Sequence, residues 1–391
     1  MKKILVITDF DSVGSGYKHI MAPLLTELQK IDDYETKLIG FMYQGEEHNY
    51  PFSVIPTATI EEASVIATNL IQLWNPDALI VGMDLPIQSR LYETFAKFGK
   101  KYIAITPLEN GPLCMTWAAP LINMDGVFFI SQLGTDEAHL AGVTKAEHLQ
   151  IGVDTVSWHP ATSEEKKRFR DGLGIPQDAF VVLTVADNQE RKNLWAGMDA
   201  ISKLKKEITR PIKYVIVTRE QNPYGFKLRD LATKLGINQE YTPYERGMPQ
   251  KDLWALYAIA DVYLQPSKAE GLGLPVLDAM CMRIPVVATD TGAMHELLSE
   301  HRGWLINSEY TFTDVWGNSK RDMLNRSETA STLRDMQWAL SSKENLSTTH
   351  TRIIDNAYDY VSKRTWDIPA KQLHDKIVEI TKDEPKTEAS E

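Results

Sequence analysis

The chain has 391 residues, 43% of them hydrophobic, which is an ordinary composition for a globular protein long enough to fold as two domains with separate cores. Its formal net charge of -11 disfavours nonspecific attraction to nucleic acid or to an anionic membrane, because such partners call for a basic surface. Cys114 and Cys281 are too few for a disulfide framework, and no stretch approaches the roughly 18 apolar residues of a membrane span, so we expect a soluble, cytoplasmic protein.

The chain begins with an apolar run, Ile4 to Ile7, which follows two lysines. A secretory signal peptide starts in a similar way, but this run is short and is followed at once by Asp9 and Asp11. We therefore predict that it forms the first buried strand. Asp9 and Asp11 flank the loop after this first strand rather than after a mid-chain strand, so we expect no metal site there.

The loop after this strand contains two glycines, Gly14 and Gly16. Glycine lets the backbone come close to a ligand, so we predict that this turn approaches a bound phosphate or a second substrate. A dinucleotide-binding site would need the longer Gly-x-Gly-x-x-Gly pattern, whereas position 19 is His19. We therefore expect no nicotinamide cofactor at this turn.

Short apolar runs alternate with amphipathic stretches in both halves of the chain, a rhythm typical of parallel sheets with helices on both faces. The runs are 4–7, 78–81, 102–105 and 127–130 in the first half and 180–185, 214–217, 262–264 and 286–288 in the second. We predict an α/β protein with two Rossmann-like, doubly wound domains.

The polar, proline-containing stretch 155–170 marks the predicted domain boundary. We place the first domain at residues 1–160 and the second at 161–365, with a C-terminal helix over 366–381. The polar tail, 382–391, is expected to be disordered.

The most informative segment is 266–280, in which Glu270 and Asp278 flank a Gly-x-Gly turn at the start of a predicted helix. Gly271 and Gly273 allow a ligand to approach the backbone closely. The unpaired N–H groups and positive dipole end of the helix favour a diphosphate, and Glu270 can accept hydrogen bonds from sugar hydroxyls. The segment therefore predicts a nucleotide-sugar site.

This segment resembles the signature of the retaining glycosyltransferases of GT-B architecture, specifically family 4, also called glycosyl transferases group 1. The family pattern Ser-x-x-Glu-Gly-Phe-Gly-Leu-Pro-x-x-Glu-Ala-Met is matched by Ser267, Glu270, Gly271, Gly273, Leu274, Pro275, Ala279 and Met280, with Leu272 at the Phe position and Asp278 at the second Glu position. Gly152 to Asp154 resembles the family's Gly-Val-Asp linker, and Pro285 to Val287 resembles its next strand. The resemblance covers most of residues 145–310.

The resemblance implies two facing domains with an interdomain cleft, and a last helix that crosses back to the first domain. It also implies transfer of a hexose from a nucleoside-diphosphate sugar, bound to the second domain, to an acceptor on the first. The anomeric configuration would be retained, and no metal or other cofactor would be needed. The residues implied are Glu270 for the sugar, Lys192, Arg191, Gly271, Leu272, Gly273 and Leu274 for the diphosphate and Asp278 for the ribose, with Gly14 and Gly16 across the cleft.

Three departures from the family pattern bear on the site or on its packing. Asp187 stands where the family has an arginine that binds the diphosphate, and we expect Arg191 to substitute for it. Asp278 is one methylene shorter than the family's Glu, which shortens its reach to the ribose. Arg283 replaces a glycine after a helix, so either that helix ends without a left-handed residue or the chain bears about 1 kcal/mol of strain.

The acceptor-side candidates lie in 106–111, directly after an apolar strand, where related enzymes often have a histidine. This segment has none, so Glu109 or Asn110 is expected to face the acceptor. The acceptor itself stays open between a glycan, a glycolipid, a small molecule and a modified DNA base, as do peripheral membrane contact, the donor's base and the oligomeric state. Because Asp187 and Asp278 depart from the signature, a non-catalytic nucleotide-sugar binding protein is a further alternative.

Overall fold

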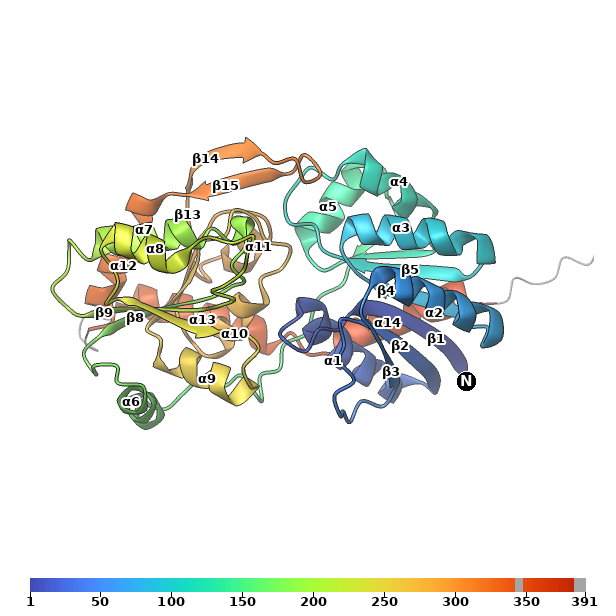
Figure 1. Ribbon diagram of the computed structural model, residues 1–391, viewed down its shortest axis with the longest axis horizontal. Helices are drawn as coiled ribbons and strands as arrows, with labels where there is room; N and C mark the ends of the chain where they lie inside the picture. The colour runs from blue at the N-terminus through green and yellow to red at the C-terminus, as the bar shows by residue number, and fades with distance from the viewer. Residues whose placement is uncertain (342–346, 383–391) are drawn as a thin grey trace, which may run out of the picture.

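The computed structural model describes residues 1–341 and 347–382 and shows two α/β domains, each built on its own parallel sheet (Figure 1). The predicted architecture of two Rossmann-like, doubly wound domains is confirmed. Of the tail predicted to be disordered, residues 383–391 lie outside the described residues.

The first domain has seven parallel strands in the order β3-β2-β1-β4-β5-β6-β7. The strands are β1 (Lys2–Asp9), β2 (Tyr34–Phe41), β3 (Ser53–Thr57), β4 (Ala78–Gly82), β5 (Lys101–Thr106), β6 (Gly126–Phe129) and β7 (Ala146–His148). The helices are α1 (Gly16–Ile31), α2 (Ile60–Leu73), α3 (Leu85–Phe95), the short 3-10 helix η1 (Ala96–Phe98), α4 (Met115–Asn123) and α5 (Gln132–Leu140). Helices cover both faces of the sheet, which is why inner strands such as β4 are uninterrupted apolar runs.

The second domain has six parallel strands in the order β10-β9-β8-β11-β12-β13, and a separate antiparallel hairpin, β14-β15. The strands are β8 (Phe180–Val185), β9 (Ile212–Thr218), β10 (Tyr241–Glu245), β11 (Val262–Gln265), β12 (Val286–Thr289), β13 (Trp304–Ile306), β14 (Ser308–Thr313) and β15 (Lys320–Leu324). The helices are α6 (Ser163–Gly172), the 3-10 helix η2 (Glu190–Lys192), α7 (Leu194–Leu204), α8 (Leu228–Leu235), α9 (Gln250–Ile259), α10 (Leu274–Cys281), α11 (Ala293–Leu298), α12 (Arg326–Ala339) and α13 (Thr348–Ser362).

Arg283 follows α10 with a φ of 56°, so this helix does end on a left-handed residue. The sequence left open whether this helix avoids a left-handed residue or bears strain, and the structure shows the strained conformation. The Arg283 guanidinium lies 2.5 Å from a carboxylate oxygen of Asp355 on α13, a helix that packs against α10.

Each sheet reverses its strand order beside its first strand, between β1 and β4 in the first domain and between β8 and β11 in the second. At such a switch point, loops from the two neighbouring strands run in opposite directions and leave a crevice at the carboxyl ends of the strands. In open α/β sheets this crevice is the usual ligand site. The loops after β8 and β11 are those that carry the residues singled out from the sequence.

The last described helix, α14 (Asp367–Ile380), lies on the first domain, where it packs against α1 (Figure 1). The Tyr34 hydroxyl lies 2.8 Å from Nδ1 of His374 on α14, and Lys376 forms a 2.7 Å ion pair with Glu147. The C-terminal helix therefore crosses back from the second domain to the first.

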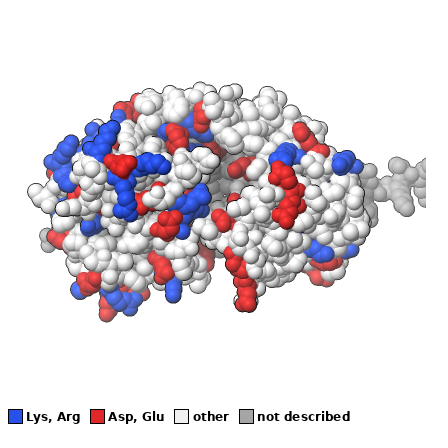
Figure 2. Space-filling model, viewed as in Figure 1, with Lys and Arg blue, Asp and Glu red and all other residues white. Residues whose placement is uncertain are grey.

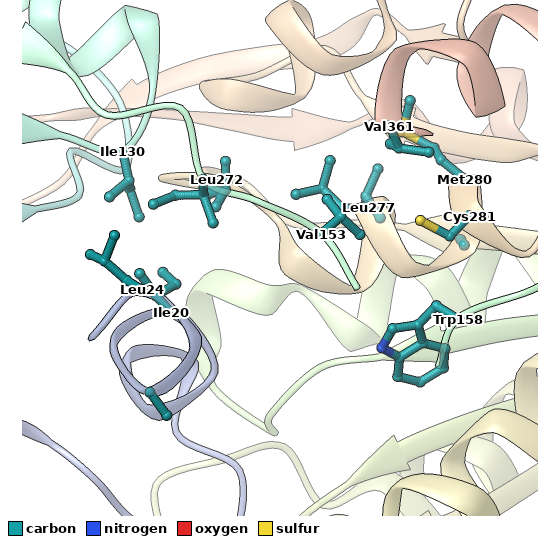
Figure 3. Packing of buried hydrophobic residues seen from close by; sticks show 14 of the residues in the cluster. Ile20, Leu24, Ile130, Val153, Trp158, Leu272, Leu277, Met280, Cys281 and Val361 are labelled. Carbon is teal, nitrogen blue, oxygen red and sulfur yellow. The ribbon is translucent and has the colours of Figure 1, made fainter. Parts of the chain in front are cut away.

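One apolar cluster continues from the first domain into the second (Figure 3). Ile20 and Leu24 of α1 and Ile130, which follows β6, lie on one side of it, and Leu272 of the second domain lies beside them. All four side chains are at most 5% exposed. Water is therefore excluded along this part of the contact between the domains.

Candidate functional site

Glu270 follows β11 and is only 4% exposed. Its carboxylate accepts hydrogen bonds from Lys192 Nζ at 2.8 and 2.9 Å and from Ser267 Oγ and Gln265 Nε2, each at 2.6 Å. Arg191 Nη1 lies 3.2 Å away. Burial alone would raise the pKa of Glu270, but the charges of Lys192 and Arg191, together with the hydrogen bonds, hold that pKa at about 2. The carboxylate is therefore ionised at neutral pH and fixes both cations.

Lys192 and Arg191 reach Glu270 because their loop leaves β8, the strand hydrogen-bonded to β11 at the switch point. The backbone N–H of Lys268 donates to the carbonyl of Arg191 at 2.9 Å, which ties the two loops together. Burial, followed by the charge of Arg191, lowers the pKa of the Lys192 ammonium. The structure thus brings together the three residues predicted from the sequence to act on the sugar and the diphosphate.

The turn before α10 needs both of its glycines. A Cβ atom at Gly271 would lie 2.6 Å from Cβ of Pro107 in the first domain. Gly273, the N-terminal cap of α10, has a φ of 89°, and a Cβ atom there would overlap Met294. Among the described residues, the backbone N–H groups of Gly273 and Leu274 at the start of α10 have no hydrogen-bond partner, and they follow Glu270 closely in the chain, so an anion is favoured there.

The glycines of the first domain lie on the opposite wall. A Cβ atom at Gly16 would be 3.8 Å from Cδ1 of Leu274, so the first turn of α1 faces the first turn of α10. Gly14, with a φ of 116°, accepts a hydrogen bond from Arg246 of the second domain through its carbonyl. Both predicted glycines thus contact the second domain.

Leu272 and Asp278 are placed differently from the other predicted donor residues. The Leu272 side chain lies in the apolar contact between the domains, so it presents only its backbone to a ligand at the turn. Asp278 lies on α10, and within residues 1–341 and 347–382 its carboxylate has no hydrogen bond or ion pair. Burial, and then the negative charge of Asp154, raise the pKa of Asp278 well above its ordinary value.

Asp187 does not leave a net negative charge at the end of β8. It forms ion pairs with Arg219, which follows β9, and with Arg246, which follows β10 and lies 3.4 Å away. Burial would raise the pKa of Asp187, but these two guanidiniums lower it. Two arginines thus neutralise the carboxylate at position 187, and the sequence analysis did not identify them as a pair. The available signal was that each directly follows the carboxyl end of a neighbouring strand.

Glu109 and Asn110, expected on the acceptor side, both reach across to the second domain. Oε1 of Glu109 lies 2.7 Å from Arg191 Nε, and Oε2 accepts a hydrogen bond from Arg321 Nη2 at 2.9 Å. Asn110 Nδ2 donates to Asp322 Oδ2 at 3.0 Å. The loop after β5 is therefore bound to the donor-side cations and to the β14-β15 hairpin.

Residues 165–314 match the family model described as glycosyl transferases group 1. The putative glycosyltransferase EpsD of Bacillus subtilis is 30% identical over 157 residues, which make up 40% of this chain and 40% of that one. A GDP-mannose-dependent alpha-(1-6)-phosphatidylinositol monomannoside mannosyltransferase of Mycolicibacterium smegmatis is 32% identical over 159 residues, which make up 38% of this chain and 40% of that one. The chain spans about 40% of the length of these curated relatives.

Solved structures match almost the whole chain. A glycosyltransferase from Rickettsia africae superimposes with a TM-score of 0.75 at 15% identity and covers 98% of this chain and 99% of its own. Anabaena HepE, in complex with UDP and glucose, superimposes with a TM-score of 0.72 at 18% identity and covers 97% of this chain and 100% of its own. The fold is GT-B. The predicted fold class is confirmed, and the resemblance to group 1 glycosyltransferases is confirmed over residues 165–314.

The described residues contain no group of three or more His, Cys, Asp or Glu side chains placed to hold a metal ion. Within the same ranges, no helix is both long and apolar enough to cross a membrane. On the face shown in Figure 2, the molecule is hollowed between its domains, and Lys and Arg are more numerous on the second domain than on the first.

Proposed function

We propose that the protein is a retaining family 4 glycosyltransferase that transfers a hexose from a nucleoside-diphosphate sugar to an acceptor without a metal ion. One observation carries the proposal: the buried cluster of Glu270, Lys192 and Arg191 lies beside the glycine turn that begins α10, at the switch point of the second sheet. Fixed cations and a helix N-terminus converge there on a single crevice. This is the arrangement that binding of a sugar diphosphate requires.

In the proposed reaction, the oxygen of an acceptor hydroxyl bonds to the anomeric carbon while the bond from that carbon to the diphosphate oxygen breaks. The hydroxyl proton passes to the departing diphosphate. Negative charge develops on this leaving group, where Lys192, Arg191 and the N–H groups of α10 stabilise it. Asp278 is proposed to bind the ribose, and Glu270 to orient the sugar while it holds the two cations in place.

The contacts between the domains support sugar transfer in preference to hydrolysis. Leu272 packs against the first domain, and Glu109 bridges the domains through Arg191, so water has limited access between them. The names of the similar proteins support a nucleoside-diphosphate sugar as the donor class, since HepE is described with UDP-glucose and the mycobacterial relative as GDP-mannose-dependent.

The test is to incubate the protein with UDP-, GDP-, ADP- and dTDP-sugars without acceptor and to measure slow release of the nucleoside diphosphate. We expect release from one donor, with loss of release in Glu270→Ala. Glu164→Ala, an exposed change on α6, is the matched control and should release the nucleotide like the wild type. Failure of the wild type to bind any of these donors in calorimetry would refute the proposal, and tight binding without release would favour a binding protein.

A further inference from the structure

A narrow hollow lies where the β14-β15 hairpin meets the first domain, and its own side chains nearly fill it in this structure. Trp117 of α4 and Trp316 of the hairpin turn line it with aromatic surface, and Asp84 and Glu109 line it with carboxylates. Figure 1 shows the β14-β15 hairpin at the top of the second domain, with its turn directed towards the first domain. The hollow therefore combines flat apolar walls with hydrogen-bond acceptors.

The two tryptophans belong to different domains but contact each other. Their ring centroids are 5.6 Å apart, with an interplanar angle of 60°. The close approach depends on Gly317, which has a φ of 65° and at which a Cβ atom would overlap the Trp117 ring. Trp316 remains 46% exposed. In this closed arrangement the rings fill the space between them, so a ligand that stacks on them must enter when the hairpin and α4 separate.

The two carboxylates follow the carboxyl ends of neighbouring strands, β4 and β5, in the first sheet. Asp84 follows β4 and occupies the N-terminal cap of α3, yet its side chain makes no capping hydrogen bond. Instead, its Oδ1 accepts a hydrogen bond from the Tyr17 hydroxyl at 2.7 Å. Glu109 follows the neighbouring strand, β5, and its other contacts are Arg191 and Arg321. Asp84 thus already serves as a hydroxyl acceptor in this structure.

We propose that this hollow is the acceptor subsite and that the acceptor is a sugar, whose ring stacks on Trp117 and Trp316 and whose hydroxyls donate to Asp84 and Glu109. The inference rests on the proposed function and names its acceptor class. A sugar ring has a face of C–H groups that packs on an aromatic ring and a rim of hydroxyls that needs acceptors. Arg191 contacts both Glu109 and Glu270, so a hydroxyl bound at Glu109 lies next to the donor site.

The other acceptor classes fit this hollow less well. A nucleic acid would bring phosphates beside Asp84 and Glu109, and two carboxylates repel them. Tyr17, Arg191 and Arg321 leave some lone pairs of Asp84 and Glu109 unused, and a purely apolar acceptor would bury these without hydrogen-bond donors, which costs free energy. The charge of the lining therefore selects a neutral ligand rich in hydroxyl groups.

The test uses methyl α-glucopyranoside, methyl α-galactopyranoside, methyl α-mannopyranoside, maltose and cellobiose as probes. Binding is measured by saturation-transfer NMR. Sugar transfer is measured by mass spectrometry with each of the UDP-, GDP-, ADP- and dTDP-sugars named above. We expect at least one probe to bind and to be glycosylated. Trp117→Ala and Trp316→Ala should each raise its dissociation constant and KM about tenfold, a typical effect of losing a stacked aromatic ring, and leave acceptor-free donor cleavage within about twofold.

Val315→Ala is the matched control, because Val315 is 97% exposed on the same turn and does not line the hollow. It should leave binding and transfer unchanged. If donor is cleaved but no probe binds, if both tryptophan variants bind the probes like the wild type, or if a DNA duplex is glycosylated instead, the sugar subsite is wrong while the proposed function stands. If a probe binds in a tryptophan-dependent way but no donor is bound or cleaved, the proposed function fails and the sugar site stands.

Discussion

Glu270 is ionised in the interior because four neighbouring side chains donate to it or pair with its charge. Lys192 and Arg191 supply the charge, and Ser267 and Gln265 supply neutral hydrogen bonds. A buried carboxylate without such partners would take up a proton instead. The cluster is therefore complete without a ligand, and a donor meets cations that are already oriented.

This arrangement makes stability depend on pH in one direction. The pKa of Glu270 is about 2 in the folded protein, against an ordinary value of 4.5. A lowered pKa contributes stability that is fully present above the ordinary value and is lost as the pH falls from about 4.5 towards about 2. We expect Glu270→Gln to lose less unfolding free energy than the wild type over this interval, as measured by urea denaturation. Glu164→Gln is the control, and parallel pH curves for Glu270→Gln and wild type would contradict the assignment.

At Asp278, the dependence of stability on pH runs in the opposite direction. Its pKa is raised in the folded protein by burial and by Asp154, so the folded state holds its proton more tightly than the unfolded chain. Stability is then lost as the pH rises above the ordinary carboxyl value of 3.8 towards the raised one. We expect Asp278→Asn to be more stable than the wild type, with a gain that is larger at pH 7 than at pH 5, and to bind the donor more weakly.

Urea denaturation at the two pH values measures the gain, and calorimetry with the donor measures the binding. A stability gain independent of pH would show that the pKa of Asp278 is not raised in the folded protein. A variant that binds the donor like the wild type would remove Asp278 from the ribose site.

The residues of the site differ in how far sequence could identify them. Glu270 and the two glycines lie in one short segment, where turn chemistry and helix-start signals are local and readable. Arg219 and Arg246 contact Asp187 only because β8, β9 and β10 are consecutive strands of the sheet. The order of strands in a sheet cannot be predicted from any single segment of the sequence. The same holds for Arg321, which meets Glu109 across the two domains.

At the scale of elements, the end of α10 is a site of stored strain. Arg283 has a φ of 56°, a conformation that costs a non-glycine residue about 1 kcal/mol. We expect Arg283→Gly to keep or raise the unfolding free energy, because the relief of strain offsets the lost ion pair with Asp355. Arg283→Ala loses the same pair and keeps the strain, so it should be less stable than Arg283→Gly by about 1 kcal/mol in urea denaturation. Equal stability of the two variants would show that the left-handed backbone carries no cost.

Elements buried on both faces were predictable, and exposed ones were not. β8 matches its predicted run because helices on both sides of the sheet favour apolar residues along it, with Thr184 as the one polar residue. β3 and β10 each lie at one edge of their sheet and each contain a proline, and their mixed burial breaks the apolar pattern. The β14-β15 hairpin is largely exposed on β14, so its sequence gave no sign that it would contact the first domain.

At the scale of the whole molecule, the domains are held together by both apolar and charged contacts. The polar contacts are Arg246 to the Gly14 carbonyl, Glu109 to Arg191 and Arg321, Asn110 to Asp322, and the Leu133 N–H to Glu296 at 3.1 Å. The apolar contact centres on Leu272. These contacts come from loops, from helices α5 and α11 and from strand β15, so closure depends on the relative placement of complete domains rather than on any single motif.

The contacts of Glu109 between the domains are expected to affect donor binding. Its carboxylate lies against Arg191, where the donor diphosphate is proposed to bind, and against Arg321, which is only 2% exposed. Nη1 of Arg321 has no hydrogen-bond partner among the described residues. A phosphate entering the site must therefore compete with Glu109 for these two guanidiniums.

We expect Glu109→Gln to bind the free nucleoside diphosphate about three- to tenfold more tightly than the wild type, since one attractive carboxylate no longer occupies the cations. The same variant should transfer sugar more slowly, because the domains lose a charged bridge and the acceptor hydroxyl donates to a neutral amide oxygen in place of a carboxylate. Calorimetry at low and high salt measures the first effect, which should shrink as salt screens the charges. Weaker nucleotide binding by Glu109→Gln would contradict this expectation. It would mean that Glu109 orients Arg191 towards the phosphate and does not compete with the phosphate for Arg191. In that case Arg321→Met would leave the nucleotide affinity unchanged.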